Sequence, residues 1–302
     1  MSRGPLVSTA STAPGIVRKL FAGAIDYAGL FPPAALEVDT ALRNYVSYRD
    51  SGDASLLGRF VCPAPRLNEL ADAIDAVRAS GGGIRVSAVL GAPANLGAVA
   101  EFNARANNAA VDSIEGKAER PDAIYELASK GSGLEVFVEL PLGGELELLV
   151  DAVRAVGVRA KVRTGGVTTE AFPPARAVVR FIRACLAAGV PFKATAGLHH
   201  PITGTYPLTY APDALRGTMF GFLNVFLATA FLSGGMPDDE AARLLDDRDA
   251  AAFSFRDHGA DWRGHHVDSA QLAATHARVF GSWGSCSFRE PLDELRSLAL
   301  LS

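Results

Sequence analysis

Short runs rich in β-forming residues alternate along the chain with longer segments rich in alanine, leucine and charged residues. Seven such runs precede residue 200, and they recur about every 25–30 residues. Each is interpreted as a buried strand, and together they lie at residues 23–31, 56–63, 84–91, 111–117, 134–141, 159–166 and 190–197. Strands that alternate with helical segments at this spacing indicate parallel βα units.

The intervening segments have the period of amphipathic helices, most clearly at residues 67–80 and 175–189. In the second segment one apolar stripe is formed by Ala177, Val178, Phe181, Ile182, Cys185 and Leu186. Gly189 follows at the position of a helix C-cap, where glycine adopts the left-handed backbone conformation most easily. We therefore expect a helix that packs this stripe on the sheet and ends at Gly189.

An eighth strand is expected at residues 280–288, with a closing helix at 290–301. Eight such units predict an α/β fold, a (β/α)8 barrel of the TIM type. We assign residues 16–302 to one barrel domain and residues 1–15 to a flexible N-terminal arm. The alternative is an open, doubly wound sheet, but no GxGxxG follows the first strand and the chain has no Walker A sequence.

The connection after the seventh predicted strand is enlarged and covers about residues 200–280. It is expected to contain helices at 219–232, 238–247 and 269–280, and a hairpin at 251–267. An insertion of this length could cover the barrel mouth as a lid. Its apolar helix at 219–232 needs a partner surface, so a homo-oligomer is one expected way to bury it.

Composition excludes several function classes. The formal net charge of −4 argues against a nucleic-acid partner, which selects for an excess of basic residues. The most apolar stretch, at residues 220–232, is shorter than the roughly 20 residues of a bilayer span, so no membrane partner is expected. Three scattered cysteines and the lack of a signal-peptide pattern predict a cytoplasmic protein without a disulfide framework.

Active sites of such barrels form at the carboxyl ends of the strands. The polar residues at those ends are Asp26, Glu115, Glu139, Lys161, Arg163, Lys193, His199, His200, Ser285 and Ser287. Side chains alternate along a strand, so an inward Lys161 places Arg163 inward and Val162 outward. In the same way, an inward Lys193 places Thr195 inward and Ala194 outward. We therefore expect both lysines inside the barrel.

Two lysines and an arginine that share a half-dry barrel are expected to repel one another. Like charge and desolvation both favour the neutral amine and lower the pKa of lysine. A neutral amine can form a Schiff base with a carbonyl compound. Asp26, Glu115 and Glu139 would balance the remaining charge and transfer protons.

At this point the sequence resembles the class I aldolases of the deoxyribose-phosphate aldolase type. "KVRTG" (161–165) is similar to the sixth-strand motif with the Schiff-base lysine, and "KATAG" (193–197) to the seventh-strand motif with a second lysine. "GSCS" (284–287) resembles the phosphate-holding loop after the eighth strand. The resemblance implies that Lys161 forms the Schiff base and that Lys193 lowers the pKa of Lys161. Arg163, where the family usually has a small or hydroxylic residue, and "LHHP" (198–201) depart from its pattern.

The leading hypothesis is a lyase of aldolase type that needs no cofactor and acts on a small carbonyl compound, phosphorylated or carboxylated. Its expected substrate-binding residues are Arg163, Thr164, Gly165, His199, His200, Ser285 and Ser287. Because adjacent residues of an extended chain face opposite sides, only one of His199 and His200 is expected to face the site. Phe31 is expected at the pocket mouth, and Cys286 is either a nucleophile or a small buried residue.

Two other hypotheses remain open. The first is a metal-dependent lyase or isomerase in which Glu115, Glu139 and His199 hold Mg²⁺, Mn²⁺ or Zn²⁺. The second is a barrel without catalytic activity, which binds a ligand or a protein through the insertion. In that case each lysine would reach solvent or pair with a neighbouring carboxylate.

Overall fold

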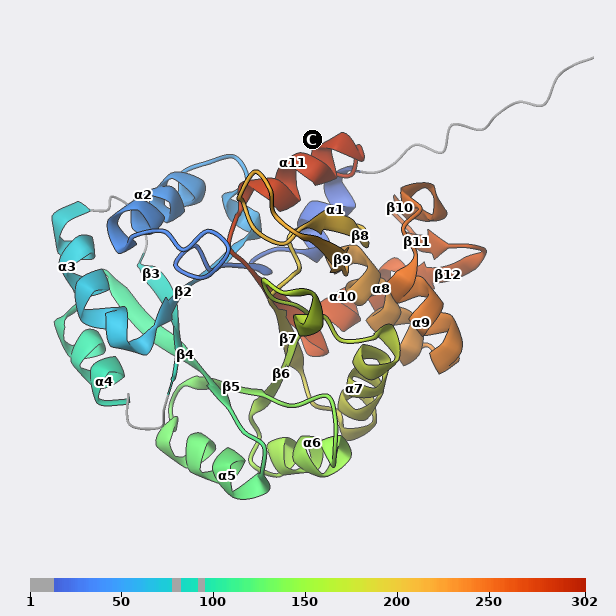
Figure 1. The fold of residues 1–302 in the computed structure, drawn as a ribbon. Coiled ribbons are helices and arrows are strands. Elements are labelled where there is room, and N and C mark those ends of the chain that lie inside the picture. Colours follow the sequence, from blue (N-terminus) through green and yellow to red (C-terminus); the bar gives the residue numbers. More distant parts are fainter. Residues whose placement is uncertain (1–13, 78–82, 92–95) are drawn as a thin grey trace, which may run out of the picture.

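Eight parallel strands close into a barrel in the computed structural model, which describes residues 14–77, 83–91 and 96–302 (Figure 1). They are β1 (Ile25–Tyr27), β2 (Leu57–Pro63), β3 (Ile84–Val89), β4 (Ala109–Lys117), β5 (Glu135–Glu139), β6 (Arg159–Arg163), β7 (Phe192–Thr195) and β13 (Phe280–Ser285). Strand β1 closes the barrel by pairing with β2 on one side and with β13 on the other. The predicted (β/α)8 fold is confirmed, and every predicted strand forms within two residues of its range or inside it.

Helices surround the barrel on its outer side (Figure 1). They are α1 (Pro14–Leu20), α2 (Val38–Arg49), α3 (Leu67–Val77), α4 (Leu96–Arg105), α5 (Pro121–Lys130), α6 (Leu146–Ala155), α7 (Ala175–Ala188), α8 (Phe222–Ser233), α9 (Asp238–Asp246), α10 (Ser269–Arg278) and α11 (Arg289–Ser297). Helix α7 buries Val178, Phe181 and Ile182 of the predicted stripe. It ends at Gly189, whose φ of 65° is left-handed, as expected for this C-cap.

Two predicted segments extend beyond the described residues. Most of the predicted N-terminal arm, residues 1–13, lies outside them, and its last two residues begin α1. The predicted helix at 67–80 forms as α3, and residues 78–80 also lie outside the described part.

The enlarged connection between β7 and β13 contains more strands than the sequence predicted. A hairpin of β8 (Gly204–Pro207) and β9 (Arg216–Met219) precedes α8. After α9, the strands β10 (Phe253–Arg256), β11 (Gly259–Trp262) and β12 (His265–Asp268) form an antiparallel sheet. The prediction of a two-stranded hairpin at 251–267 was therefore wrong, because a third strand follows in the structure. A two-residue turn at Arg263 and Gly264, both with positive φ, returns the chain into β12.

Helix α8 is buried on all sides, from Phe222 to Leu232. It contacts α7, α9, α10 and β13, which supply the partner surface from within the chain. The apolar helix thus gives no reason to expect a second subunit. Its 12 residues are also too few to cross a bilayer, and no other helix in the described ranges is long and apolar enough to do so.

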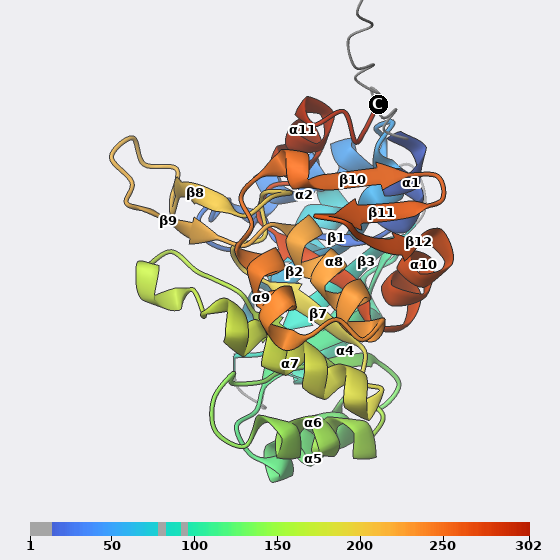
Figure 2. The same ribbon diagram turned by 90° about the vertical axis from the view of Figure 1, so that its right-hand side faces the viewer.

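The β8–β9 hairpin lies beside the mouth of the barrel. Figure 2 shows it projecting from the same end as the loop between β6 and α7, and β9 contacts the short helix η4 (Thr169–Ala171) in that loop. Helix α9 instead packs on α7 and α8, and the β10–β12 sheet packs on α1 and α10. Only part of the insertion is therefore placed to influence the active end.

Candidate active site

The two lysines occupy matching positions on neighbouring strands. Lys161 on β6 pairs in register with Lys193 on β7, and Arg163 pairs with Thr195. Val162 and Ala194 are fully buried on the helix side. All four of the polar side chains line one pocket, as the alternation of the strands predicted.

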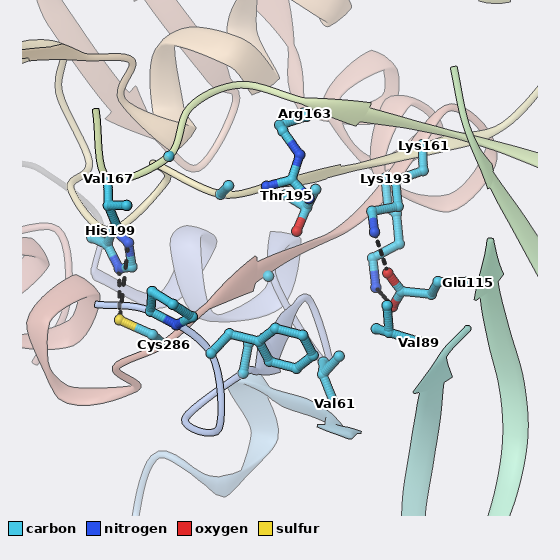
Figure 3. Close-up of a pocket in the computed structure, with 16 residues that line it drawn as sticks. Val61, Val89, Glu115, Lys161, Arg163, Val167, Lys193, Thr195, His199 and Cys286 are labelled. Carbon is cyan, nitrogen blue, oxygen red and sulfur yellow. Dashed lines mark hydrogen bonds and ion pairs between the residues drawn. The ribbon is translucent and has the colours of Figure 1, made fainter. Parts of the chain in front are cut away.

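This pocket is a cavity of about 220 Å³ at the carboxyl end of the barrel (Figure 3). Its polar lining residues are Glu115, Lys161, Arg163, Lys193, Thr195, His199 and Cys286. Its apolar lining includes Phe31, Pro32, Val61, Val89 and Val167. Phe31 was expected there, whereas the valines of β2 and β3 were missed because nothing in the sequence separates them from other strand residues. A volume of this size fits a small metabolite.

Glu115 joins the two lysines at the closed end of the pocket. Its Oε2 lies 2.8 Å from Lys161 Nζ, and its Oε1 lies 2.8 Å from Lys193 Nζ. Figure 3 shows this carboxylate between the two amines. Each side chain of the trio is no more than 5% exposed. The carboxylate therefore links both amines in a setting where water screens little.

Each lysine also contacts a carboxylate of its own. Lys193 Nζ lies 2.5 Å from Asp26 Oδ2, and Lys161 Nζ lies 3.0 Å from Glu139 Oε2. Glu139 also accepts a hydrogen bond of 3.0 Å from Arg163 Nε. Asp26 and Glu139 are buried, but they lie behind the lysines and do not line the cavity.

Hydroxyl and backbone donors hold these carboxylates in place. Ser87 Oγ donates to Glu115 over 2.8 Å, and Ser282 Oγ donates to Asp26 over 3.1 Å. The backbone N–H of Arg59 donates to Asp26 Oδ1 over 2.8 Å. A Cβ at Gly58 would lie 2.4 Å from the same oxygen, so only glycine leaves room for the carboxylate. The sequence reasoning missed the two serines because isolated hydroxyls carry little signal.

The expected lowering of the lysine pKa is wrong for Lys193. Burial lowers the pKa of Lys193, but the charges of Asp26 and Glu115 raise it by more, and the net shift is upward. Burial would raise the pKa of Glu115, yet Lys161 and Lys193 hold it well below its usual range. The pKa of Glu139 falls to about 2, because Lys161 and Arg163 outweigh its burial. Paired charges therefore dominate over repulsion between the lysines.

His199 and Cys286 form the opposite end of the pocket (Figure 3). His199 Nδ1 lies 3.1 Å from Ser285 Oγ and 3.7 Å from Cys286 Sγ. Tyr210, in the β8–β9 loop, places its hydroxyl 3.5 Å from Cys286 Sγ. Burial and His200 lower the pKa of His199 to about 4, and burial raises the pKa of Cys286 to about 11. Both groups are therefore uncharged near neutral pH.

Several predicted substrate-binding residues do not line the pocket. His200 stacks on Tyr206 and places Nδ1 2.6 Å from Glu294, so His199 is the one histidine of the pair that lines the pocket. Thr164 Oγ1 donates to the carbonyl of Ala196 over 2.6 Å and ties the two strand ends together. The others do not line it either: a Cβ at Gly165 would lie 2.3 Å from the Phe172 ring, Ser285 Oγ donates to the carbonyl of Ser287, and Ser287 Oγ accepts the Glu290 N–H at the start of α11.

The alternative metal site is not assembled. Lys161 Nζ lies between Glu115 and Glu139, and His199 belongs to the other end of the pocket. Across residues 14–77, 83–91 and 96–302, no three His, Cys, Asp or Glu side chains gather into a group that could hold a metal ion.

Comparison with known proteins adds little to this geometry. No family model matches the sequence, and no curated protein matches it. Two similar solved structures are those of a lysine/ornithine decarboxylase from Vibrio vulnificus, complexed with cadaverine and with putrescine. They are 9% and 10% identical, with TM-scores of 0.40 and 0.41, over 90% of this chain. This chain spans 62% of their length, and likeness at this level carries no argument about function.

Proposed function

We propose that this chain is a lyase of the class I aldolase type, in which Lys161 forms a Schiff base with a small aldehyde or ketone. The observation that carries the proposal is the pair of buried, in-register lysines that line one cavity and share Glu115. Amines with carboxylate partners in a small enclosed cavity are suited to condense with a carbonyl and to exchange protons.

Lys161 is the better nucleophile of the two. The raised pKa of Lys193 keeps its amine protonated, and an ammonium ion has no lone pair with which to attack. Lys161 has two carboxylates, Glu115 and Glu139, within 3.0 Å of Nζ that are placed to accept the proton it must release. The Lys161 charge is a main cause of their low pKa, so their pKa rises once that charge is lost. The resemblance of "KVRTG" to the sixth-strand motif of the aldolases points to the same residue.

Formation of the Schiff base then needs two proton transfers that the site can supply. The freed amine of Lys161 attacks the carbonyl carbon, and the oxygen leaves as water after it receives protons. A proton returned from Glu115 or Glu139 would assist this departure. The positive iminium nitrogen would then take up the electron pair of the breaking carbon–carbon bond to give an enamine. The hydroxyl on the departing carbon would lose its proton to Glu115 or Glu139 and become the carbonyl of the released fragment. Lys193, which stays charged, would stabilise negative charge that develops on the substrate.

The proposal is tested by trapping the Schiff base with borohydride. The protein is incubated with a panel of small aldehydes and ketones, reduced, and mapped by peptide mass spectrometry. An adduct at Lys161 is expected, in excess over the exposed surface amine of Lys130, which reports non-specific reaction. Lys161→Arg is the matched variant, because it keeps the positive charge beside Glu115 but cannot form the adduct.

The same experiment separates the proposal from a barrel without catalytic activity. If the carbonyls of the panel are trapped at Lys130 as readily as at Lys161, the Schiff-base function is overturned. If Lys193 is labelled and Lys161 is not, the roles of the two lysines are reversed.

A further inference from the structure

The end of the pocket away from the lysines offers a hydrogen-bond acceptor, on His199, and no positive charge. Ser285 Oγ donates its only proton to the carbonyl of Ser287, over 2.6 Å. It must therefore accept from His199 Nδ1, which lies 3.1 Å away. In a neutral imidazole this leaves Nε2 as the acceptor.

His199 Nε2 has spare capacity for a ligand. Among the described residues, this nitrogen contacts the thiol of Cys286, at 4.0 Å. His199 and Cys286 both line the cavity. A ligand that reaches this end of the pocket therefore meets a ring nitrogen with a lone pair, and it can satisfy that nitrogen only by donating a proton.

A negative charge lies just behind this end of the pocket. Glu290 Oε2 accepts a hydrogen bond of 3.0 Å from the Tyr210 hydroxyl and lies 3.8 Å from His199 Nδ1. Glu290 occupies the first turn of α11, where a bound anion would otherwise be favoured. The carboxylate therefore repels an anionic group from the N-terminus of α11.

The cations of the pocket are already paired. Lys161, Arg163 and Lys193 are the cationic residues among those that line it, and each contacts a buried carboxylate. Three carboxylates, those of Asp26, Glu115 and Glu139, lie against these three cations, and Glu139 is also 3.5 Å from Lys117 Nζ, which lies outside the lining. Each cation of the described lining therefore already has a carboxylate partner, and a phosphate or a carboxylate would have to compete with it.

We propose that the substrate is an uncharged, hydroxylated aldehyde or ketone, whose hydroxyl donates to His199 Nε2 while its carbonyl reaches Lys161. This inference rests on the proposed function, and it narrows the substrate class of that site. An ionised phosphate or carboxylate at the same position has no proton to donate to Nε2, and the negative charge of Glu290 would repel it.

The test compares three aldehydes with the same carbon skeleton: glyceraldehyde, propanal and glyceraldehyde 3-phosphate. Each is trapped at Lys161 with borohydride, and its rate is normalised to that of a free lysine derivative. We expect glyceraldehyde to react about two- to tenfold faster than propanal, the range of one neutral hydrogen bond. Glyceraldehyde 3-phosphate is expected to be the slowest of the three.

Two variants locate the effect. His199→Phe keeps an aromatic ring without Nε2 and should abolish the preference for glyceraldehyde over propanal. Glu290→Gln removes the negative charge and should narrow the discrimination against glyceraldehyde 3-phosphate. The comparison in the unaltered protein decides the inference if either variant fails to fold.

Faster trapping of glyceraldehyde 3-phosphate than of glyceraldehyde in the unaltered protein overturns the inference and leaves the Schiff-base proposal intact. If none of the three is trapped, the Schiff-base proposal is overturned instead. Ligand-detected NMR with the same three compounds then decides the inference, and a stronger signal from the phosphate ester contradicts it.

Discussion

Lys161 and Lys193 lie opposite each other on adjacent strands, and they contact the two oxygens of one carboxylate, Glu115. Two ammonium groups at one register position would repel each other strongly in a dry interior. Glu115 prevents this by lying between them, and Asp26 and Glu139 complete the neutralisation from β1 and β5. The chemistry of the pocket therefore depends on carboxylates from three other strands.

Glu115→Gln should strongly destabilise the fold, because it removes the carboxylate that both buried amines share. Losing one partner of a buried ion pair costs about 3–5 kcal/mol. Glu126→Gln is the matched control, since Glu126 pairs with Lys130 on the surface of α5 and its loss should cost less than about 1 kcal/mol. Urea unfolding measures both changes, and similar losses in the two variants would contradict the arrangement.

Acid should remove the stabilising contribution of Glu139. The pKa of this carboxyl is lowered to about 2 from an ordinary value of 4.5, so its contribution is fully present above 4.5. It is lost as the pH falls toward 2, because the unfolded chain takes up the proton first. Glu139→Gln lacks this contribution at every pH. The difference in Tm between the two proteins should therefore shrink between pH 4.5 and 2, and a constant difference would be inconsistent with the lowered pKa.

His199 should remain neutral, with its proton on Nδ1, throughout the physiological range. Burial lowers its pKa to about 4, and the contact with Ser285 sets the tautomer. Nitrogen-15 NMR of the imidazoles reads both properties, with His199→Phe used to assign the signals. A midpoint near the ordinary value of 6.5, or a proton on Nε2, would remove the acceptor proposed for the substrate hydroxyl.

Cys286 should react slowly with iodoacetamide at pH 8, although it lines the pocket. Burial raises the pKa of its thiol to about 11, so little thiolate is present at that pH. Cys62 and Cys185, which are also buried, serve as internal references in peptide maps. Alkylation of Cys286 as fast as that of a free cysteine derivative would revive the hypothesis that it is a nucleophile.

Much of the fold could be predicted because short runs of β-forming residues recur between helical segments at a regular spacing. The alternation on β6 and β7 also predicted that Lys161 and Lys193 point into the barrel. The strands of the insertion were harder to predict. Strands β8 and β9 are short, with exposed or half-buried residues at most positions, and β12 begins after a two-residue turn that is easily taken for the end of a hairpin.

The site was only partly predictable, because its balance of charge depends on contacts far apart in the sequence. The neighbouring lysines suggested repulsion and a lowered pKa, whereas Asp26 lies 167 residues from Lys193 and reverses the shift. The contact between His199 and Ser285 spans 86 residues and likewise follows from barrel closure. Local patterns identify which side chains face the barrel, but not which of them touch.

The most direct measurement of the central claim is the mass of the peptide that contains Lys161 after borohydride reduction with glyceraldehyde. A Schiff base at this residue predicts that the peptide gains the mass of the reduced adduct, and that Lys161→Arg loses the gain while Lys130 is labelled no more than before. An unmodified Lys161 peptide in the folded protein, with adducts confined to surface amines, would contradict the claim.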